Sequence, residues 1–159
     1  RRHQRVASTV PQRVRQVKQA IGTSGPVHVL RLEPGEDLRP AIQAWATKSN
    51  IEAATVVSAV GSLSAAHLRY AGRADGIMIT GELEVCSFSG TLAKHGLHLH
   101  LSVADRDGAM VGGHLLPGCI VRTTMELVIQ QIEGVRMARA KDMVTTYDEL
   151  DPQQLPSKP

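Results

Sequence analysis

The chain has 159 residues, of which 42% are hydrophobic and 3% aromatic, and it carries a formal net charge of +3. This length fits one domain with a real core, and the scarcity of aromatic side chains argues against nucleic-acid binding by base stacking. No apolar run approaches the roughly 20 residues that a membrane-spanning helix needs, so no membrane contact is expected. Cys86 and Cys119 lie outside any CxxC pair and predict buried free thiols in a reducing cytoplasm.

The basic character of the chain is concentrated in residues 1–26. Six of the 18 lysines and arginines lie there and no acidic residue does, whereas the rest of the chain carries 12 basic and 15 acidic residues. Such a basic N-terminal arm can bind DNA phosphates without sequence preference. A solvated arm without a ligand is the simpler interpretation, and both remain open.

Residues 27–50 predict one strand followed by one helix. Apolar residues dominate 27–32, and Asp37 stands where a helix N-cap belongs. Five apolar residues then recur with the spacing of one helical face: Leu38, Ala41, Ile42, Trp45 and Ala46. The helix is expected to bury this face and to end near Asn50.

From residue 53 onward the pattern favours strands almost throughout, with Gly61 and Gly81 as breaks. Outside the hairpin described next, the expected strands are 53–60, 63–71, 77–79, 82–89, 119–132 and 136–141. The last 15 residues hold three prolines and few apolar side chains, which indicates a frayed end. The expected organisation is an arm over 1–26, one domain over 27–150 and a flexible C-terminal tail over 151–159.

The stretch 97–116 predicts a β-hairpin that gathers three histidines. Apolar residues alternate with His98 and His100, and residues 105–108 (DRDG) are typical of a tight turn. If the turn is a three-residue loop ending on its glycine, His100 faces His114 across the hairpin, and His98 lies diagonally from His114. A two-residue loop would place His114 on the opposite face.

Three imidazoles on one face can converge on one metal ion. Three histidines without a fourth protein ligand are typical of an open zinc site, where water or a substrate oxygen takes the remaining position. The alternative is a set of hydrogen-bonded histidines in a polar groove or a subunit interface. Gly112 and Gly113 leave room beside His114 for an ion, a ligand or another backbone.

Four motifs in this order resemble the plant-and-prokaryote-conserved (PPC) domain: LEPGED (32–37), SAVGSL (58–63), GLHLHL (96–101), and Asp107-Gly108 through Gly112-Gly113-His114-Leu115. The resemblance covers about residues 27–150. It implies an α/β (α+β) fold in which one main helix packs on a strongly bent, mostly antiparallel sheet, and it implies homotrimers. It also implies a fold relationship to acetolactate decarboxylase, whose zinc is held by an HxH pair and a later histidine; these positions correspond to His98, His100 and His114.

The chain departs from the plant members of this family at two points. It has no Arg-Gly-Arg-Pro core, so DNA binding through an AT-hook is not implied. The plant segment Gly-Arg-Phe-Glu-Ile-Leu, used in partner contacts, corresponds to residues 81–86, which read Gly-Glu-Leu-Glu-Val-Cys. Glu82 in place of arginine argues against plant-type partner binding and favours a stand-alone prokaryotic member, for which DNA binding rests on analogy.

Three functions fit these observations. The first is a trimeric assembly protein that binds DNA non-specifically through its basic arms. The second is a metal-dependent enzyme, lyase-like or hydrolase-like, that uses zinc or another divalent transition metal on a small oxygenated acid. Arg122 and Glu126 would then supply an anion contact and an acid/base group. The third is a non-catalytic trimer whose groove binds a metal ion or a small anionic ligand.

Overall fold

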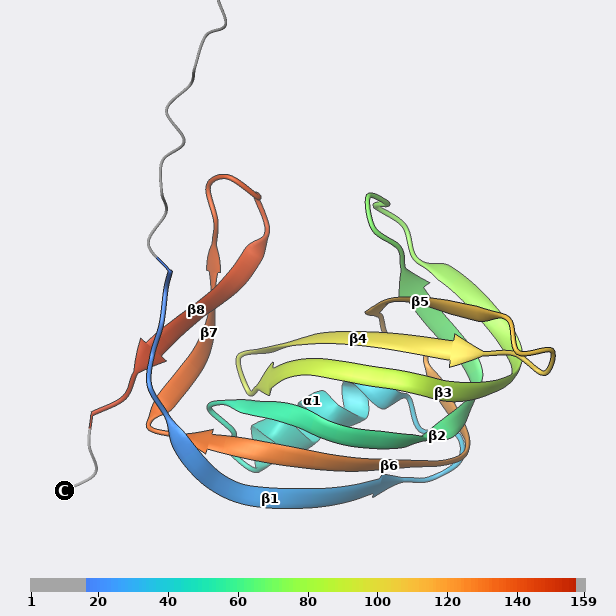
Figure 1. Ribbon diagram of the computed structural model, residues 1–159, viewed down its shortest axis with the longest axis horizontal. Coiled ribbons are helices and arrows are strands. Elements are labelled where there is room, and N and C mark those ends of the chain that lie inside the picture. Colours follow the sequence, from blue (N-terminus) through green and yellow to red (C-terminus); the bar gives the residue numbers. More distant parts are fainter. Residues whose placement is uncertain (1–16, 157–159) are drawn as a thin grey trace, which may run out of the picture.

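The computed structural model describes residues 17–156, which form one six-stranded antiparallel sheet, one helix and one two-stranded sheet (Figure 1). The elements in chain order are β1 (Thr23–Leu32), α1 (Leu38–Lys48), β2 (Ala54–Arg69), β3 (Ile77–Ala93), β4 (Gly96–Ala104), β5 (Met110–Leu115), β6 (Ile120–Glu133), β7 (Val135–Lys141) and β8 (Asp148–Gln154). The predicted combination of one helix with a mostly antiparallel sheet is confirmed.

The large sheet bends so strongly that its last strand returns to an inner one. The strand order is β1-β6-β2-β3-β4-β5, and β5 pairs again with the end of β2 through Leu68–Leu115 and Arg69–His114. β2 and β3, at 16 and 17 residues, are long enough to belong to both the flat and the curled parts of the sheet. The curl brings His114 beside the backbone of β2.

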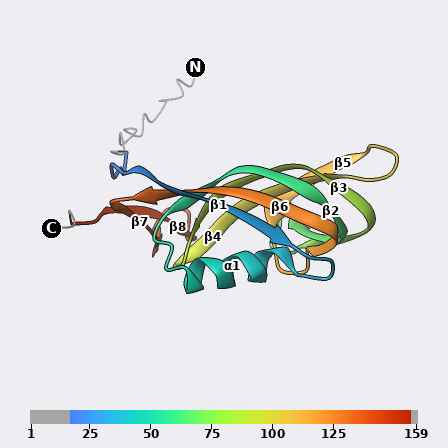
Figure 2. The same ribbon diagram turned by 90° about the horizontal axis from the view of Figure 1, so that it is seen from below.

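Helix α1 covers one face of the sheet, as Figure 2 shows. Leu38, Ile42 and Ala46 of its apolar face are buried, and Trp45 is half-buried with its ring edge against His28, at 5.1 Å between centroids. The predicted helical face is therefore confirmed. In the part of the chain that the structure describes, no helix has the length and apolarity to cross a membrane.

Asp37 is the N-cap residue of α1, as predicted, but its side chain does not make the expected capping hydrogen bond to an amide of the first helical turn. Instead its Oδ2 accepts a hydrogen bond of 2.7 Å from the backbone N–H of Gly118. The carboxylate therefore ties the start of the helix to the loop before β6, which no local capping pattern predicts.

Gly61 and Gly81 were predicted to break strands, and both lie inside continuous strands. A Cβ at Gly61 would collide with the carbonyl oxygen of Thr124, so glycine there permits the close approach of β2 to β6. Gly81 has a φ of +143°, which glycine adopts without strain, and β3 continues through it. Both glycines serve a bent sheet and do not mark its loops.

The predicted tail is wrong for residues 151–154. They belong to β8, which pairs with β7 from Lys141–Asp148 to Val135–Gln154. Pro152 pairs with Met137 of β7. The backbone N–H of Met137 points away from β8 and donates to the carbonyl oxygen of Glu52 at 2.9 Å, so this pair of residues exchanges no hydrogen bond. A residue in that register needs no N–H toward β7, so proline costs no ladder hydrogen bond.

The two cysteines are both free, and only one of them is buried. Burial raises the pKa of the Cys119 thiol to about 11, which makes it an inert core residue. Cys86 is exposed because the register of β3 and β4 shifts between Val85 and Ser87, at a β-bulge. The prediction of two buried thiols is correct for Cys119 and wrong for Cys86.

Candidate metal centre

The β4–β5 hairpin has the register that its turn sequence predicts. Asp105 N donates to Ala109 O at 3.0 Å, and Gly108, with a φ of +82°, donates its N–H to Asp105 O at 3.0 Å. The Asp105 carboxylate also accepts the backbone N–H groups of Asp107 and Ala109, each at 2.9 Å. His100 consequently pairs with His114 across the hairpin. The three-residue loop is confirmed over the two-residue alternative.

The three imidazole rings lie against one another. The ring centroids are 4.4 Å apart for His100 and His114, 5.1 Å for His98 and His100, and 5.3 Å for His98 and His114. One nitrogen from each ring lies within 4.8 Å of the other two. Nitrogens bound to one tetrahedral zinc ion at about 2.0–2.1 Å are about 3.3 Å apart, so small side-chain rotations bring this set to metal-binding geometry.

The surroundings of His98 and His114 favour the neutral form of these two imidazoles. Burial lowers the pKa of His98, and the positive charges of His100, Arg139 and Arg39 lower it further against an opposing effect of Glu149. Burial likewise lowers the pKa of His114, together with His100 and Arg69. His100 Nε2 and His114 Nδ1 are 3.1 Å apart, a hydrogen-bond distance. Neutral imidazole is the form that ligates metal, so these shifts favour a metal site near neutral pH.

Glycines let the neighbouring backbones approach the histidine strands. A Cβ at Gly113 would lie 2.6 Å from the carbonyl oxygen of Arg69, so the space beside His114 is taken by the backbone of β2. Gly112 likewise faces Ser102, whose Cβ would be 3.0 Å away. Of the three occupants predicted for this space, the structure shows another backbone. Gly90, on β3, has a φ of +139°, and a Cβ there would collide with the carbonyl oxygen of His98.

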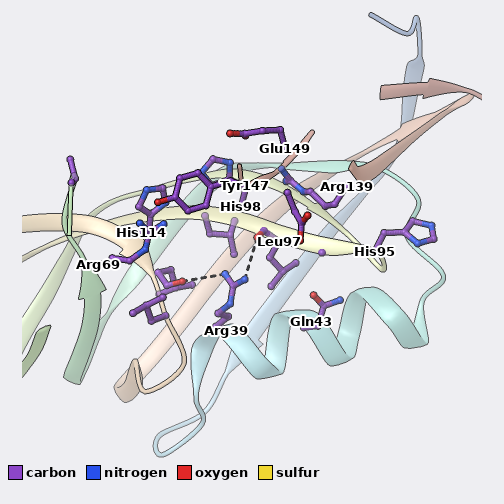
Figure 3. Close-up of a pocket in the computed structure, with 17 residues that line it drawn as sticks. Arg39, Gln43, Arg69, His95, Leu97, His98, His114, Arg139, Tyr147 and Glu149 are labelled. Atoms are coloured by element: carbon purple, nitrogen blue, oxygen red, sulfur yellow. Dashed lines mark hydrogen bonds between the residues drawn. The ribbon is translucent and has the colours of Figure 1, made fainter. Parts of the chain in front are cut away.

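A cavity of about 800 Å³ opens beside the histidines, as Figure 3 shows. His98 and His114 line it together with Arg39 from α1, Arg69 from the end of β2 and Arg139 from β7. Arg39 donates to the carbonyl oxygens of Leu97 and Leu115, each at 3.2 Å, and so holds β4 and β5 together where their pairing has ended. The chain thus places two of the three clustered histidines, His98 and His114, at the wall of a cationic cavity.

Sequence reasoning did not find these three arginines. Arg39 and Arg139 lie 100 positions apart, and each looks like a solvated charge in its own element. No local pattern marks Arg39 as a binding residue, because it is the second residue of a helix with a regular apolar face and resembles an ordinary surface charge. Long-range packing, which no single-chain pattern specifies, brings the arginines together.

Arg122 and Glu126, predicted as candidate catalytic residues, are not among the residues that line this cavity. Both are exposed on β6, and Arg122 forms an ion pair with Glu82. Glu126 lies between Arg31 of β1 and Val60 of β2 in the strand register. Their shared strand face is confirmed, and their catalytic role stays a prediction.

Comparisons with known proteins agree with the fold and the motifs. A family model described as the Plants and Prokaryotes Conserved (PCC) domain matches residues 19–133. The chain is 44% identical over 124 residues to bifunctional protein GlmU of Synechococcus sp. (strain JA-3-3Ab), covering 78% of this chain and 20% of that protein. It is 26% identical over 132 residues to AT-hook motif nuclear-localized protein 8 of Arabidopsis thaliana, covering 76% and 33%. The chain thus spans about a fifth of the GlmU relative and a third of the plant relative.

Solved structures resemble the chain over nearly its whole length. A hypothetical protein from Salmonella enterica superposes with a TM-score of 0.81 at 39% identity, covering 87% of this chain and 99% of that one. A metal-containing protein from Archaeoglobus fulgidus superposes with a TM-score of 0.72 at 26% identity, covering 86% and 99%.

Proposed function

Because the chain belongs to the Plants and Prokaryotes Conserved domain family, we propose that its domain binds one divalent transition-metal ion through His98, His100 and His114. The observation that carries this proposal is the convergence of three imidazole nitrogens within 4.8 Å on one hairpin. The description of the Archaeoglobus relative as metal-containing supports it.

The donor set favours zinc among the possible ions. Three neutral nitrogen ligands suit zinc, copper, nickel or iron, whereas magnesium and calcium prefer oxygen ligands. Three protein ligands leave a coordination position for water or for a ligand oxygen. A bound zinc ion would supply Lewis acidity to that oxygen. His98, His100 and His114 hold the ion in this proposal, and the cavity admits the oxygen-bearing ligand.

Elemental analysis of protein never exposed to chelator tests the proposal. We expect about one zinc or similar ion per chain, and its loss from a His98→Ala variant, because two imidazoles bind much more weakly than three. His28→Gln is the matched control, since His28 packs on Trp45 and bonds Gln131 outside the cluster. A wild-type protein that stays metal-free after added zinc would refute the site, as would equal metal content in the His98→Ala variant.

We also propose, as a second function, non-specific DNA association through the basic arm. Five of its six basic residues lie in 1–16, outside the described residues, and the similarity to an AT-hook nuclear protein supports this proposal. The acidic balance of residues 27–159 argues that any DNA contact is confined to the arm. Deleting residues 1–16 should abolish retention on duplex DNA at low salt. Unchanged retention by the shortened protein would refute it.

A further inference from the structure

Two arginines in the histidine cavity, Arg39 and Arg139, have no ion-pair partner among the described residues. Among residues 17–156, no carboxylate lies within ion-pair distance of Arg39 or Arg139, although other arginines, such as Arg136, have such a partner. Both guanidinium groups are partly buried, and each has a lowered pKa because burial disfavours its charge. Arg139 lowers the pKa of Arg39 further, whereas the carboxylate of Glu149 opposes the lowering at Arg139 without outweighing it. Cations without an ion-pair partner in one recess are costly unless a ligand compensates them.

Most of the hydrogen-bond donors of this arginine pair are free for a ligand. A guanidinium has five N–H donors. Arg39 uses two of them, on Leu97 O and Leu115 O, and Arg139 uses one, on Thr91 Oγ1 at 3.2 Å. The remaining donors have no acceptor among the described residues. The bonds that are made fix the direction of each group, which is the preorganisation that oxyanion recognition needs.

The position of the pair relates it to the histidines. Arg39 comes from α1 and Arg139 from β7, and both line the same cavity as His98 (Figure 3). Arg69 adds a third cation next to His114. The cavity contains two carboxylates, of Asp148 and Glu149, so its cations outnumber its anions even without a metal ion.

From this geometry we infer that the cavity binds a small organic oxyanion, whose carboxylate or phosphate group rests on Arg39 and Arg139 while another of its oxygens reaches the open position at the three histidines. The arginine half of this inference stands on its own, and only the second contact rests on the proposed metal site. A planar guanidinium pairs with carboxylate or phosphate oxygens through two parallel hydrogen bonds. A recess of about 800 Å³ suits a small molecule more than a polymer backbone.

Calorimetric titration of zinc-free and zinc-loaded protein tests this inference. The probes are inorganic phosphate and a series of acetate, malonate and succinate, which separates the phosphate and carboxylate sources. We expect at least one probe to bind, more tightly to the zinc-loaded form. The Arg139→Gln variant should bind it about tenfold more weakly or worse, because a charge-assisted pair is lost. Arg31→Gln, which removes the same charge from the exposed face of β1, should bind it within about twofold of wild type.

A second variant separates anion recognition from folding. Arg39→Lys keeps the charge and can still donate to one strand carbonyl, but it loses the fork that holds two oxygens. The Arg39→Lys variant should bind the anion more weakly than wild type does, while its zinc content and melting temperature stay near those of wild type.

Several results would overturn the inference. These are no probe binding up to about 10 mM in either form, equal binding by Arg139→Gln and wild type, an equal loss in Arg31→Gln, or displacement of the probe by short duplex DNA. If zinc fails to bind but Arg139→Gln still loses the anion, the anion site stands and the proposed metal function falls.

Discussion

At the scale of single residues, Glu52 connects two segments that contribute residues to the cavity: β7 and the turn between β3 and β4. Its carboxylate accepts Arg136 Nε at 2.7 Å, Lys94 Nζ at 2.6 Å and His95 Nε2 at 3.0 Å, and its carbonyl accepts Met137 N. These contacts join β7 to the turn between β3 and β4, directly before the histidine strand. Removing one carboxylate would therefore loosen both sides of the cavity.

The ionisation of Glu52 predicts a pH dependence of stability. Burial alone would raise its pKa, but hydrogen bonds from Arg136, Lys94 and His95 outweigh it and lower the pKa to about 2 from the usual 4.5. A depressed carboxyl pKa stabilises the fold above about pH 4.5, and this contribution is lost as the pH falls from 4.5 toward 2. Glu52→Gln should cost on the order of 1–2 kcal/mol at pH 7 and much less near pH 2.5.

Urea denaturation of both proteins at pH 7 and pH 2.5 measures this difference. Glu133→Gln is the control, because that glutamate is the exposed last residue of β6. A Glu52→Gln penalty that does not shrink in acid would show that the loss comes from packing and not from charge.

The histidines and the arginines differ in how far the sequence predicts them. The three histidines share one hairpin, so strand alternation and one turn type place them together. The two arginines of the inferred anion site come from a helix and from a strand near the other end of the chain. Arg139 shares the cavity with Arg39 only because β7 docks beside the turn before β4 through Glu52, a contact without a local signature.

At the scale of the elements, glycines set how closely the neighbouring strands approach the histidine cluster. Gly90 of β3 lies directly under β4, opposite Leu99 in the register. Because Gly90 has no side chain, β3 and β4 can pair closely here; a Cβ at this position would collide with the carbonyl oxygen of His98 and displace it. The position of His98 therefore depends on a residue of the neighbouring strand.

Two alanine substitutions separate close approach from backbone strain. Gly90 and Gly81 have similar φ values, +139° and +143°, but a Cβ at Gly81 meets nothing within 4 Å. Gly81→Ala should cost about 1–2 kcal/mol through strain alone. Gly90→Ala should cost at least about 2 kcal/mol more, because it adds a backbone collision. It should also weaken zinc binding.

Chemical denaturation and a zinc titration of the two variants give the result. Equal penalties would mean that β4 shifts freely away from β3 and that Gly90 does not position His98. Several elements were predictable, since α1, β4 and β6 follow their apolar periods and β5 follows from the hairpin turn. The continuity of β2 and β3 was not, because a glycine that permits close approach and a glycine that ends a strand look the same in one sequence.

At the scale of the whole molecule, exposed valines gather on one face of the sheet. Val29 of β1 is 77% exposed and pairs with Val128 of β6, while Val57 and Val60 of β2 are 61% and 63% exposed. They lie on the sheet face away from α1, because the neighbouring residues Leu30 and Leu127 pack into the core. We propose that these valines (the valine face) form the contact of the homotrimer that the resemblance to the PPC domain implies.

Light scattering after size-exclusion chromatography tests that assembly. Wild-type protein should have the mass of three chains, and the double variant Val29→Glu/Val57→Glu should be monomeric, because six carboxylates would be buried at the contacts. Met143→Glu is the control, an exposed apolar residue between β7 and β8. A monomeric wild type, or an unchanged mass in the double variant, would refute the valine face as the trimer contact.

The hairpin origin of the three histidines has a consequence for the order in which the protein assembles. His98, His100 and His114 lie within 17 residues and need only one turn to meet, whereas the oxyanion pocket needs α1, β4 and β7 in place. Short loops close before long ones, because closure entropy grows with separation along the chain. If both proposed sites bind their ligands, a nascent or partly unfolded chain would therefore capture the metal ion before it could recognise the anion. The ion would then act as a folding nucleus, and zinc present during refolding should speed the formation of the curled sheet.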